Sequence, residues 1–456
     1  MAADHWVRIA LAGSLAAGGL SCSDESGPGA VSIDRVAGRG TTLSFTNTPL
    51  LRPDGSSEPA ISVGLDGTTA LSGLSWTQFF TNVWKGPFGS TPVFQGQIDA
   101  HIGKSIGGGD ADIDLGTTGT LHATTLVFFF NPTFNAVQLG VSAITCPNAN
   151  TSDDFASCKA QILDQTQSDR QWVTSDGARV YISYHDAGSS TLIHVQRSDD
   201  DGFTFQRVGD PVVAQGGVTG DATFNNDQGP IVADPVTHNV YDVYDAGEPG
   251  IQKATTATFN NIFVSRSTDF GQSWTANKVF SAPLFTALNN VFPSLAVDPA
   301  NGTLYAVWSD AHTVSLSRSG DQGTTWSPAL VVSRAPANTA VFPWVAALNG
   351  TVDVVFYGTT SSSKDDPSAV WNVYLAQSTN GGASFQQGQV TAHPNHVGVI
   401  CTNGTGCARG TRNLLDLFEV AMDPVSGRTG IIYTDDTLTK QADGSPLPQV
   451  VLAQQQ

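Results

Sequence analysis

Short runs of β-branched and aromatic residues, separated by turns rich in Asp, Asn, Pro and Gly, recur along most of the chain. One phrase consists of an apolar strand, a tight turn and a second strand, and its clearest copy spans residues 292–308. Runs of this kind bounded by turn formers predict strands. Further copies begin near Glu58, Asp110, Asp169, Asp227, Phe342 and Leu417. The pattern therefore predicts an all-β chain built from repeated units.

Seven such starts over residues 58–456 give about 57 residues per unit, which is enough for four short strands and their loops. The seventh unit has only three visible strands, the last at residues 449–452. We expect the missing strand to come from Thr42-Leu43-Ser44-Phe45. Closing a ring in this way would remove exposed sheet edges.

An eight-residue turn of the form S-x-[D/N]-x-G-x-[S/T]-[W/F] follows a predicted strand in units three to six. The Asp or Asn can accept backbone N–H groups, the Gly supplies an unusual conformation, and the aromatic ring buries apolar area. The copies occupy residues 198–205, 267–274, 319–326 and 378–385. Their defining residues are Ser198, Asp200, Gly202 and Phe205; Ser267, Asp269, Gly271 and Trp274; Ser319, Asp321, Gly323 and Trp326; and Ser378, Asn380, Gly382 and Phe385.

This turn resembles the Asp box, or bacterial neuraminidase repeat, of the sialidase superfamily and other β-propellers. The resemblance implies a β-propeller in which the boxes are structural turns on the face away from the active site. The repeat count favours seven blades of about four antiparallel strands. Six blades, as in the catalytic sialidases that the chain resembles, with the first unit outside the ring, is the alternative.

The N-terminus predicts export. Residues 9–20 are apolar or small and follow Arg8, a length that suits a signal peptide and is too short to span a bilayer. Small residues before Cys22 resemble the bacterial lipoprotein cleavage site, at which Cys22 would be lipidated. We expect a signal peptide at 1–22, a tether at 23–41 and the propeller at 42–456. The protein would then be extracytoplasmic, as a bacterial cell envelope lipoprotein or a secreted protein.

The five cysteines fit this compartment. Pairing Cys146 with Cys158 and Cys401 with Cys407 leaves only Cys22 over. Both local pairs are reasonable disulfides in an oxidising compartment. A metal site is the alternative, but the spacings lack the C-x-x-C signature.

The charge excludes some partners. The net charge is −19 and no basic run occurs, so nucleic acid and anionic membrane surfaces would be repelled. Membrane contact is expected only through the lipid anchor, and the chain is expected to be a monomer.

Connections between antiparallel strands sort onto two faces. On the face that we call the top face, each first strand begins and each second strand ends. Strand starts supply Asp110, Asp112, Asp169, Arg170, Asp227, Arg412, Asp416 and Glu419. Strand ends supply His185, Asp186, Asp245, Asp310, His312, Asp435 and Asp436. Each residue can equally cap a turn or a strand end. Together they predict an acidic face that favours cations or neutral polyols. Calcium would suit such carboxylates, but no motif supports it and no cofactor is expected.

The sialidase resemblance also implies three arginines that hold a substrate carboxylate, a Tyr–Glu nucleophile pair and an Asp acid. The Phe-Arg-Ile-Pro motif that carries the first arginine is absent. Arg170 and Arg412 stand at suitable strand starts, and Tyr433 with Glu419 is the candidate pair in the last unit. Three further arginines directly precede a box Ser, which marks them as repeat positions: Arg197, Arg266 and Arg318.

Two classes of function stay open. One is a non-catalytic, surface-displayed propeller that binds a glycan or protein through its acidic top face, and the missing arginine motif favours it. The other is a glycoside hydrolase, of the exo-α-sialidase type, with a non-standard active site. A carboxylate pair about 5 to 10 Å apart could act as acid and base on a glycosidic bond.

Overall fold

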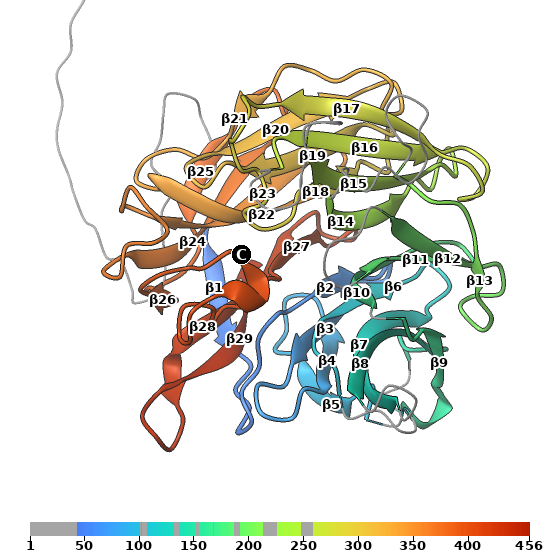
Figure 1. Ribbon diagram of the computed structural model, residues 1–456, viewed down its shortest axis with the longest axis horizontal. Helices are drawn as coiled ribbons and strands as arrows, with labels where there is room; N and C mark the ends of the chain where they lie inside the picture. Colours follow the sequence, from blue (N-terminus) through green and yellow to red (C-terminus); the bar gives the residue numbers. More distant parts are fainter. Residues whose placement is uncertain are drawn as a thin grey trace, which may run out of the picture.

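All strands in the described part of the chain belong to seven small antiparallel sheets, arranged as the blades of a propeller (Figure 1). The structure is a computed structural model that describes residues 43–100, 102, 107–131, 136–151, 155–166, 168–186, 192–212, 226–247 and 259–456. Two short 3-10 helices, η1 (Phe155–Ser157) and η2 (Gly404–Gly406), are the only helices of these residues. The predicted seven-bladed propeller is confirmed, and the six-bladed alternative is wrong.

Each of the first three blades takes four strands in sequence order. Blade 1 comprises β2 (Ile61–Val63), β3 (Thr68–Leu74), β4 (Thr81–Pro87) and β5 (Val93–Gln97). Blade 2 comprises β6 (Ala111–Leu115), β7 (Leu121–Asn131), β8 (Ala136–Cys146) and β9 (Lys159–Asp164). Blade 3 comprises β10 (Ser168–Asp176), β11 (Arg179–Asp186), β12 (Ile193–Ser198) and β13 (Gln206–Arg207).

The next three blades follow the same order, with one extra strand in blade 6. Blade 4 comprises β14 (Asn226–Ala233), β15 (Val240–Ala246), β16 (Asn261–Ser267) and β17 (Thr275–Ser281). Blade 5 comprises β18 (Ser294–Val297), β19 (Leu304–Ser309), β20 (Val314–Ser319) and β21 (Leu330–Val331). Blade 6 comprises β22 (Thr339–Leu348), β23 (Thr351–Thr359), β24 (Val370–Ser378) and β25 (Gln386–Gln389), with β26 (His396–Val397) also paired to β24.

Blade 7 joins the two ends of the described chain. It comprises β27 (Glu419–Met422), β28 (Thr429–Lys440), β29 (Pro446–Gln455) and, as its fourth strand, β1 (Phe45–Pro49). β1 runs antiparallel to β29, from Phe45 opposite Gln455 to Pro49 opposite Val451. The N-terminal strand therefore closes the ring as expected, but three residues later than the predicted Thr42–Phe45. Thr42 itself lies outside the described residues.

The first strand of each blade contacts the first strands of its neighbours, so β2, β6, β10, β14, β18, β22 and β27 form the inner ring. Apolar side chains from facing sheets fill the space between blades. Tyr357 of blade 6 stacks on Phe418, just before β27, with 4.4 Å between ring centroids. Trp172 of β10 packs edge-on against Phe292, just before β18, at 5.7 Å.

The four repeated turns share one hydrogen-bond pattern and each joins the third strand of a blade to the fourth. In the copy at 319–326, the backbone N of Gly323 donates to Ser319 Oγ at 2.9 Å, and Ser319 Oγ donates to Asp321 Oδ1 at 2.7 Å. Asp321 Oδ1 also accepts from the backbone N of Thr325 at 2.9 Å. Gly323 has φ of 77°, which favours glycine. The turn is therefore stapled by its own side chains, as its sequence predicts.

The arginines before these turns link one blade to the next. Arg197 Nη1 donates to the carbonyl of Phe270 at 2.8 Å, in the repeated turn of the following blade. Arg266 donates in the same way to Gln322, and Arg318 to Gly381. The arginines are thus repeat positions, as expected. Since each of the four turns joins the third strand of a blade to the fourth, the turns lie on the face opposite the top face, which we call the bottom face.

Both predicted disulfides are present. Cys146–Cys158 spans the connection from β8 to β9, which is the place in blade 2 that the repeated turns occupy in blades 3 to 6. Cys401–Cys407 lies in the long connection from β26 to β27. Cys22, the signal peptide and the tether lie outside the described residues.

Removing the closing strand should destabilise the propeller. We expect a chain that begins at residue 51 to lose roughly 3 kcal/mol or more relative to one that begins at residue 43, because it loses the buried Leu43 and Phe45 and the ladder with β29. Chemical denaturation of the two truncated chains measures this difference. Equal unfolding free energies would show that β1 does not close the ring.

The aromatic residue that ends each repeated turn varies in burial. Trp274 is 8% exposed, whereas Trp326 is only partly buried, so the expectation that the motif buries its ring holds more fully for Trp274. We expect Trp274→Ala to cost about 3 to 5 kcal/mol, and the matched Trp326→Ala to cost less. Denaturant melts of both variants provide the comparison, and a smaller loss at Trp274 would contradict it.

Candidate functional site

A cavity of about 590 Å³ opens where the inner strands of blades 2, 3, 4 and 7 begin, on the top face. Both polar and apolar residues line it. Its lining residues are Gly108, Asp110, Leu126, Phe128, Leu139, Asp169, Arg170, Asp186, Asp227, Asn289, Val291, Thr402, Asn403, Gly404, Arg412 and Asp416. The size is that of a small-molecule site.

The cavity gathers many of the residues that the sequence singled out. Both candidate arginines, Arg170 and Arg412, line it together. Among the lining residues no third arginine occurs. Five predicted acids join them: Asp110, Asp169, Asp186, Asp227 and Asp416.

Arg170 enters the cavity from an irregular point in β10. The strand shifts register between Asp169 and Trp172, and Arg170 has φ of 58°. Its Nη1 lies 3.1 Å from Asp227 Oδ1, and its guanidinium sits 4.7 Å from the centre of the Phe292 ring. Burial lowers the pKa of Arg170, but the charges of Asp227 and Asp169 outweigh it and raise the pKa above its ordinary value. This arginine is therefore paired before any ligand arrives.

Arg412 is paired in the same way. Its Nε donates to Asp416 Oδ1 at 3.0 Å, and Nη2 donates to the other carboxylate oxygen. Bidentate pairs of this kind are strong and directional. Burial by itself would lower the pKa of Arg412. The hydrogen bond to Asp416 outweighs this effect and raises the pKa above its ordinary value. Neither arginine presents an unneutralised fork to a substrate carboxylate.

Glu58 is the residue that sequence reasoning missed. It is buried just before β2 with φ of 48°, and its Oε1 accepts the backbone N of Asp416 at 2.9 Å. Burial, followed by the charge of Asp110, raises the pKa of Glu58 well above its ordinary value, and the two carboxyl groups share a hydrogen bond. Burial and the neighbouring negative charge therefore favour the protonated form of Glu58. The sequence did contain a signal for Glu58: it stands at the start of the first unit, as Asp110 and Asp169 stand at the starts of the second and third.

Asp169 is a second carboxyl group whose pKa is raised above its ordinary value. Burial and the neighbouring charge of Asp110 raise the pKa of Asp169 to about 6. Its Oδ1 accepts the backbone N of Arg170 at 2.9 Å, which holds it at the start of β10. Asp169 is thus a lining carboxyl whose protonated form is favoured by burial.

His185 and Asp245 extend this charged cluster away from the cavity lining. Burial lowers the pKa of His185, and the charge of Asp227 opposes that shift. Burial and then Asp227 raise the pKa of Asp245 well above its ordinary value. Both residues are buried at the ends of second strands, as the sequence predicts for the top face.

Asp112 and Glu419 make hydrogen bonds between neighbouring blades. Asp112 Oδ2 accepts the backbone N of Val173 in the next blade at 2.7 Å. Glu419 Oε2 accepts the backbone N of Ile61, also in the next blade, at 2.9 Å. Both carboxyl groups are buried and satisfy N–H groups on the inner edge of a neighbouring blade. They stabilise the ring and do not line the cavity.

The structure does not bring Tyr433 and Glu419 together. Glu419 pairs with Ile432 across the sheet and reaches toward blade 1. Tyr433 is the next residue along β28, so its side chain lies on the opposite face of the sheet. It is 1% exposed, and its hydroxyl donates to Asn47 Oδ1 in β1 at 2.9 Å. The Tyr433 and Glu419 side chains, which the sialidase resemblance would pair, thus lie on opposite faces of the blade 7 sheet.

The remaining predicted residues lie outside this cavity. Asp310 Oδ1 accepts the backbone N of His312 at 3.0 Å and so caps the turn between β19 and β20. Asp435 is buried beside His393, with 2.9 Å between Oδ2 and the ring Nε2. Asp436 pairs with His396 at 2.9 Å. For these positions the turn-capping and strand-end interpretation holds.

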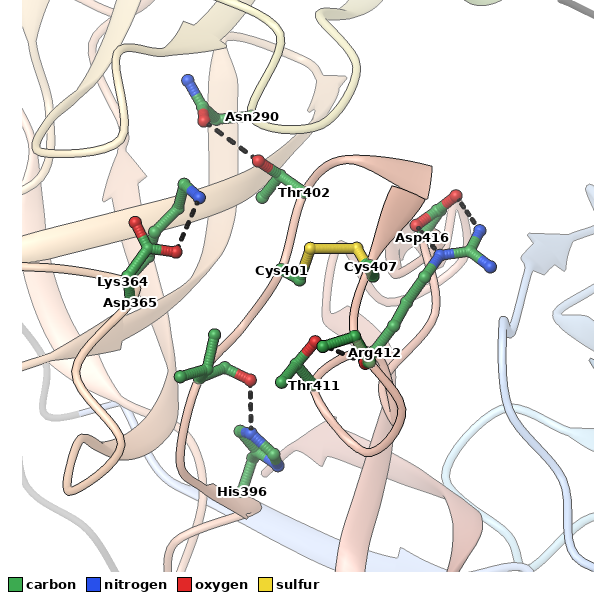
Figure 2. Close-up of a disulfide and its surroundings, with 12 residues drawn as sticks. Asn290, Lys364, Asp365, His396, Cys401, Thr402, Cys407, Thr411, Arg412 and Asp416 are labelled. Atoms are coloured by element: carbon green, nitrogen blue, oxygen red, sulfur yellow. Dashed lines mark hydrogen bonds and ion pairs between the residues drawn. A yellow bond between two sulfur atoms is a disulfide. The ribbon is translucent and has the colours of Figure 1, made fainter. Parts of the chain in front are cut away.

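A disulfide-braced connection forms one wall of the cavity (Figure 2). Cys401–Cys407 closes a short loop that carries η2. Thr402 Oγ1 donates to Asn290 Oδ1 at 3.4 Å, which ties the loop to the segment before β18. Figure 2 shows Thr402 and Arg412 on either side of the disulfide, with Arg412 directed to Asp416. The second predicted disulfide therefore supports the site directly.

A resident metal finds no support in the described residues, because no group of three or more His, Cys, Asp or Glu side chains there has the arrangement to hold an ion.

No protein-family model matches the chain, and no curated protein matches it either. Among solved structures, an ulvan lyase of a polysaccharide lyase family is similar with a TM-score of 0.53 and 11% identity, over 89% of this chain and 95% of the lyase. The same lyase, bound to -[GlcA(1-4)Rha3S]-, gives the same values. This likeness shows a shared propeller fold.

Two further structures are more distant. The sialidase of Trypanosoma rangeli has a TM-score of 0.45 and 12% identity, over 93% of this chain and 56% of the sialidase. The α-L-arabinofuranosidase of Fusarium graminearum has a TM-score of 0.44 and 13% identity, over 91% of this chain and 98% of that enzyme.

Stability should fall as the pH rises from 5 to 8. Burial raises the pKa of Asp112 to about 7 and those of Asp99, Asp169 and Asp353 to about 6. A carboxyl whose pKa is raised by folding stabilises the fold fully below its unfolded pKa, near 4, and that contribution is lost as the pH rises through the folded pKa. Burial lowers the pKa of His185, so this residue contributes in the opposite sense: its contribution to stability increases as the pH rises. Melting temperatures at pH 5 and 8 measure the combined effect of these carboxyl groups and His185 on stability.

Asp353→Asn is the matched control for this pH dependence. It removes one of the buried titrating carboxyls while keeping an oxygen to accept from Gln377 or Thr429. We expect the difference in melting temperature between pH 5 and 8 to shrink. A wild-type protein that melts higher at pH 8 than at pH 5 would contradict the assignment.

Proposed function

We propose that this chain is an exported propeller that binds an uncharged carbohydrate in the 590 Å³ cavity. One observation carries the proposal: the cavity is rich in hydrogen-bonding groups, yet each of its arginines is already neutralised by an aspartate of the chain. Such a surface offers directional acceptors and donors without a net positive charge. Sugar hydroxyl groups, which both donate and accept, match it.

The charge of the lining favours neutral over anionic sugars. Five aspartates line the cavity against two arginines. An anionic sugar such as sialic acid would meet repulsion here, and no unpaired arginine would compensate for it.

The apolar side of the cavity suits the carbon face of a sugar ring. Leu126, Phe128 and Val291 contribute to the lining beside the charged residues. Binding sites commonly combine such apolar walls with a few placed polar groups. The ulvan lyase that shares the fold was solved with a bound oligosaccharide, which supports the carbohydrate class. A protein ligand at the same face is the alternative of the binding class.

A glycoside hydrolase is the second candidate, because several carboxyl groups line the cavity. Asp169, with a pKa of about 6, is the group that would serve as the general acid.

Export and surface anchoring remain part of the proposal. The two disulfides are consistent with an oxidising compartment. The described residues contain no helix of the length and apolar character needed to cross a membrane. The signal peptide at 1–22, the tether at 23–41 and lipidation of Cys22 rest on the sequence pattern.

The proposal also includes membership of the Asp-box propellers. Its support is the shared geometry of the repeated turns: Ser198, Ser267, Ser319 and Ser378 each accept the backbone N of the Gly four residues later, at 2.8 to 2.9 Å. The box residues, on the bottom face, would then be structural.

Calorimetry with neutral oligosaccharides tests the binding function. A glycan array selects the best neutral ligand, and Asp169→Asn should then weaken its affinity roughly tenfold to a hundredfold, the range for one lost hydrogen bond to a charged group. Asp310→Asn, which changes a turn cap outside the cavity, should leave affinity unchanged. Equal losses in the two variants would contradict a site at the cavity.

A fluorogenic sialoside, incubated with the same purified protein, distinguishes the proposed binding function from sialidase activity. We expect no release of sialic acid, with or without calcium. Turnover that collapses in both Arg170→Ala and Arg412→Ala would instead establish a sialidase, and turnover of neutral glycosides lost in Asp169→Asn would establish the hydrolase alternative.

A further inference from the structure

A second cavity, of about 720 Å³, adjoins the first on the other side of the disulfide-braced loop. It lies between the loop, the turn from β3 to β4 and the hairpin of β28 and β29. Its lining residues are Trp76, Val397, Gly404, Cys407, Ala408, Arg409, Gly410, Arg412, Asn413, Asp436, Thr437, Gln441, Ser445 and Pro446.

The two cavities adjoin each other, because Gly404 and Arg412 line both of them. Asp416 holds the guanidinium of Arg412 at this shared boundary. The disulfide Cys401–Cys407 keeps the loop between the cavities short and closed.

Two long hairpins bound the combined space at its ends. β28 and β29 are among the longest strands of the chain, and the residues of their connection, Gln441 and Ser445, line the second cavity. β7 and β8 contribute Phe128 and Leu139 to the first cavity. The two cavities together therefore extend over the top face from blade 7 to blade 2, with Trp76 as the contribution of blade 1.

The second cavity differs chemically from the first. Its one carboxylate, Asp436, is held by His396 and by Asn413 Nδ2 at 2.8 Å. Arg409 is exposed, Trp76 is half-buried, and both line this cavity. An aromatic face among hydrogen-bonding groups offers a large apolar contact to one side of a flat, polar-edged ring.

We propose that the two cavities are consecutive parts of one cleft that binds a linear, uncharged oligosaccharide, with Trp76 stacking on a sugar unit distant from Asp169. This inference rests on the carbohydrate binding proposed above and specifies its ligand as a chain of several sugars. The volume supports this, because each cavity alone already has the size of a site for a small molecule.

Affinity as a function of chain length tests the cleft. Calorimetry uses arabino-, xylo-, manno- and galacto-oligosaccharides of two to six units with the full chain. For the series that binds, affinity should rise with length in the wild type. Trp76→Ala should remove that rise and weaken the longest member about fivefold to tenfold, as expected for one aromatic contact. The disaccharide should be unaffected by Trp76→Ala but weakened by Asp169→Asn.

Phe79→Ala is the matched control, because Phe79 is an exposed aromatic residue on the same turn that lines neither cavity. Arg409→Ala, at an exposed rim position, provides a second variant should Trp76→Ala not fold. Affinity independent of length, or equal effects of Trp76→Ala and Phe79→Ala, would overturn the cleft while leaving the first cavity as a binding site. Absence of binding by every series would overturn the proposed function itself.

Discussion

The pairing of β1 with β29 is the constraint on which the rest of the structure depends. Blade 7 takes its first three strands from the end of the chain and its fourth from residues 45–49. The chain then passes directly into blade 1, so the two neighbouring blades are joined covalently as well as by packing. Closure in this way pairs the outer side of β29 with β1, which leaves β1 as the edge strand of blade 7. The strand starts on the top face can converge only because the ring closes.

The inner edges of the blades explain why many acidic residues are structural. An inner strand has a ladder on one side only, so its other N–H groups need acceptors. Asp112 and Glu419 supply them across the gap between blades. Glu58 does the same for the backbone N of Asp416, and its side chain also interacts with Asp110, which lines the cavity. Burial raises the pKa of these groups because the scaffold role removes them from water.

The paired arginines separate the proposed site from a sialic acid site. In each case a carboxylate of the chain already pairs with the guanidinium: Asp227 forms an ion pair with Arg170, and Asp416 accepts two hydrogen bonds from Arg412. Their function is then to order the wall between the two cavities and to present fixed polar edges. Preorganised polar groups bind hydroxyl groups at a small entropic cost. The disulfide-braced loop serves the same end by fixing Arg412 and Gly404 between the cavities.

The sequence by itself determined the features that depend on near neighbours in the chain. The repeated turns close through hydrogen bonds between residues two to four positions apart, such as Ser319 and Asp321, and both disulfides close short loops. The seven-fold repeat and the strand starts followed from the same local patterns. Only the tertiary structure decided which acids meet. Asp110 and Asp416 are distant in sequence and converge with Glu58, whereas Glu419 and Tyr433, close in sequence, lie on opposite faces of one sheet. Turn chemistry acts within a few residues, but side-chain convergence depends on blade order, strand register and ring closure together.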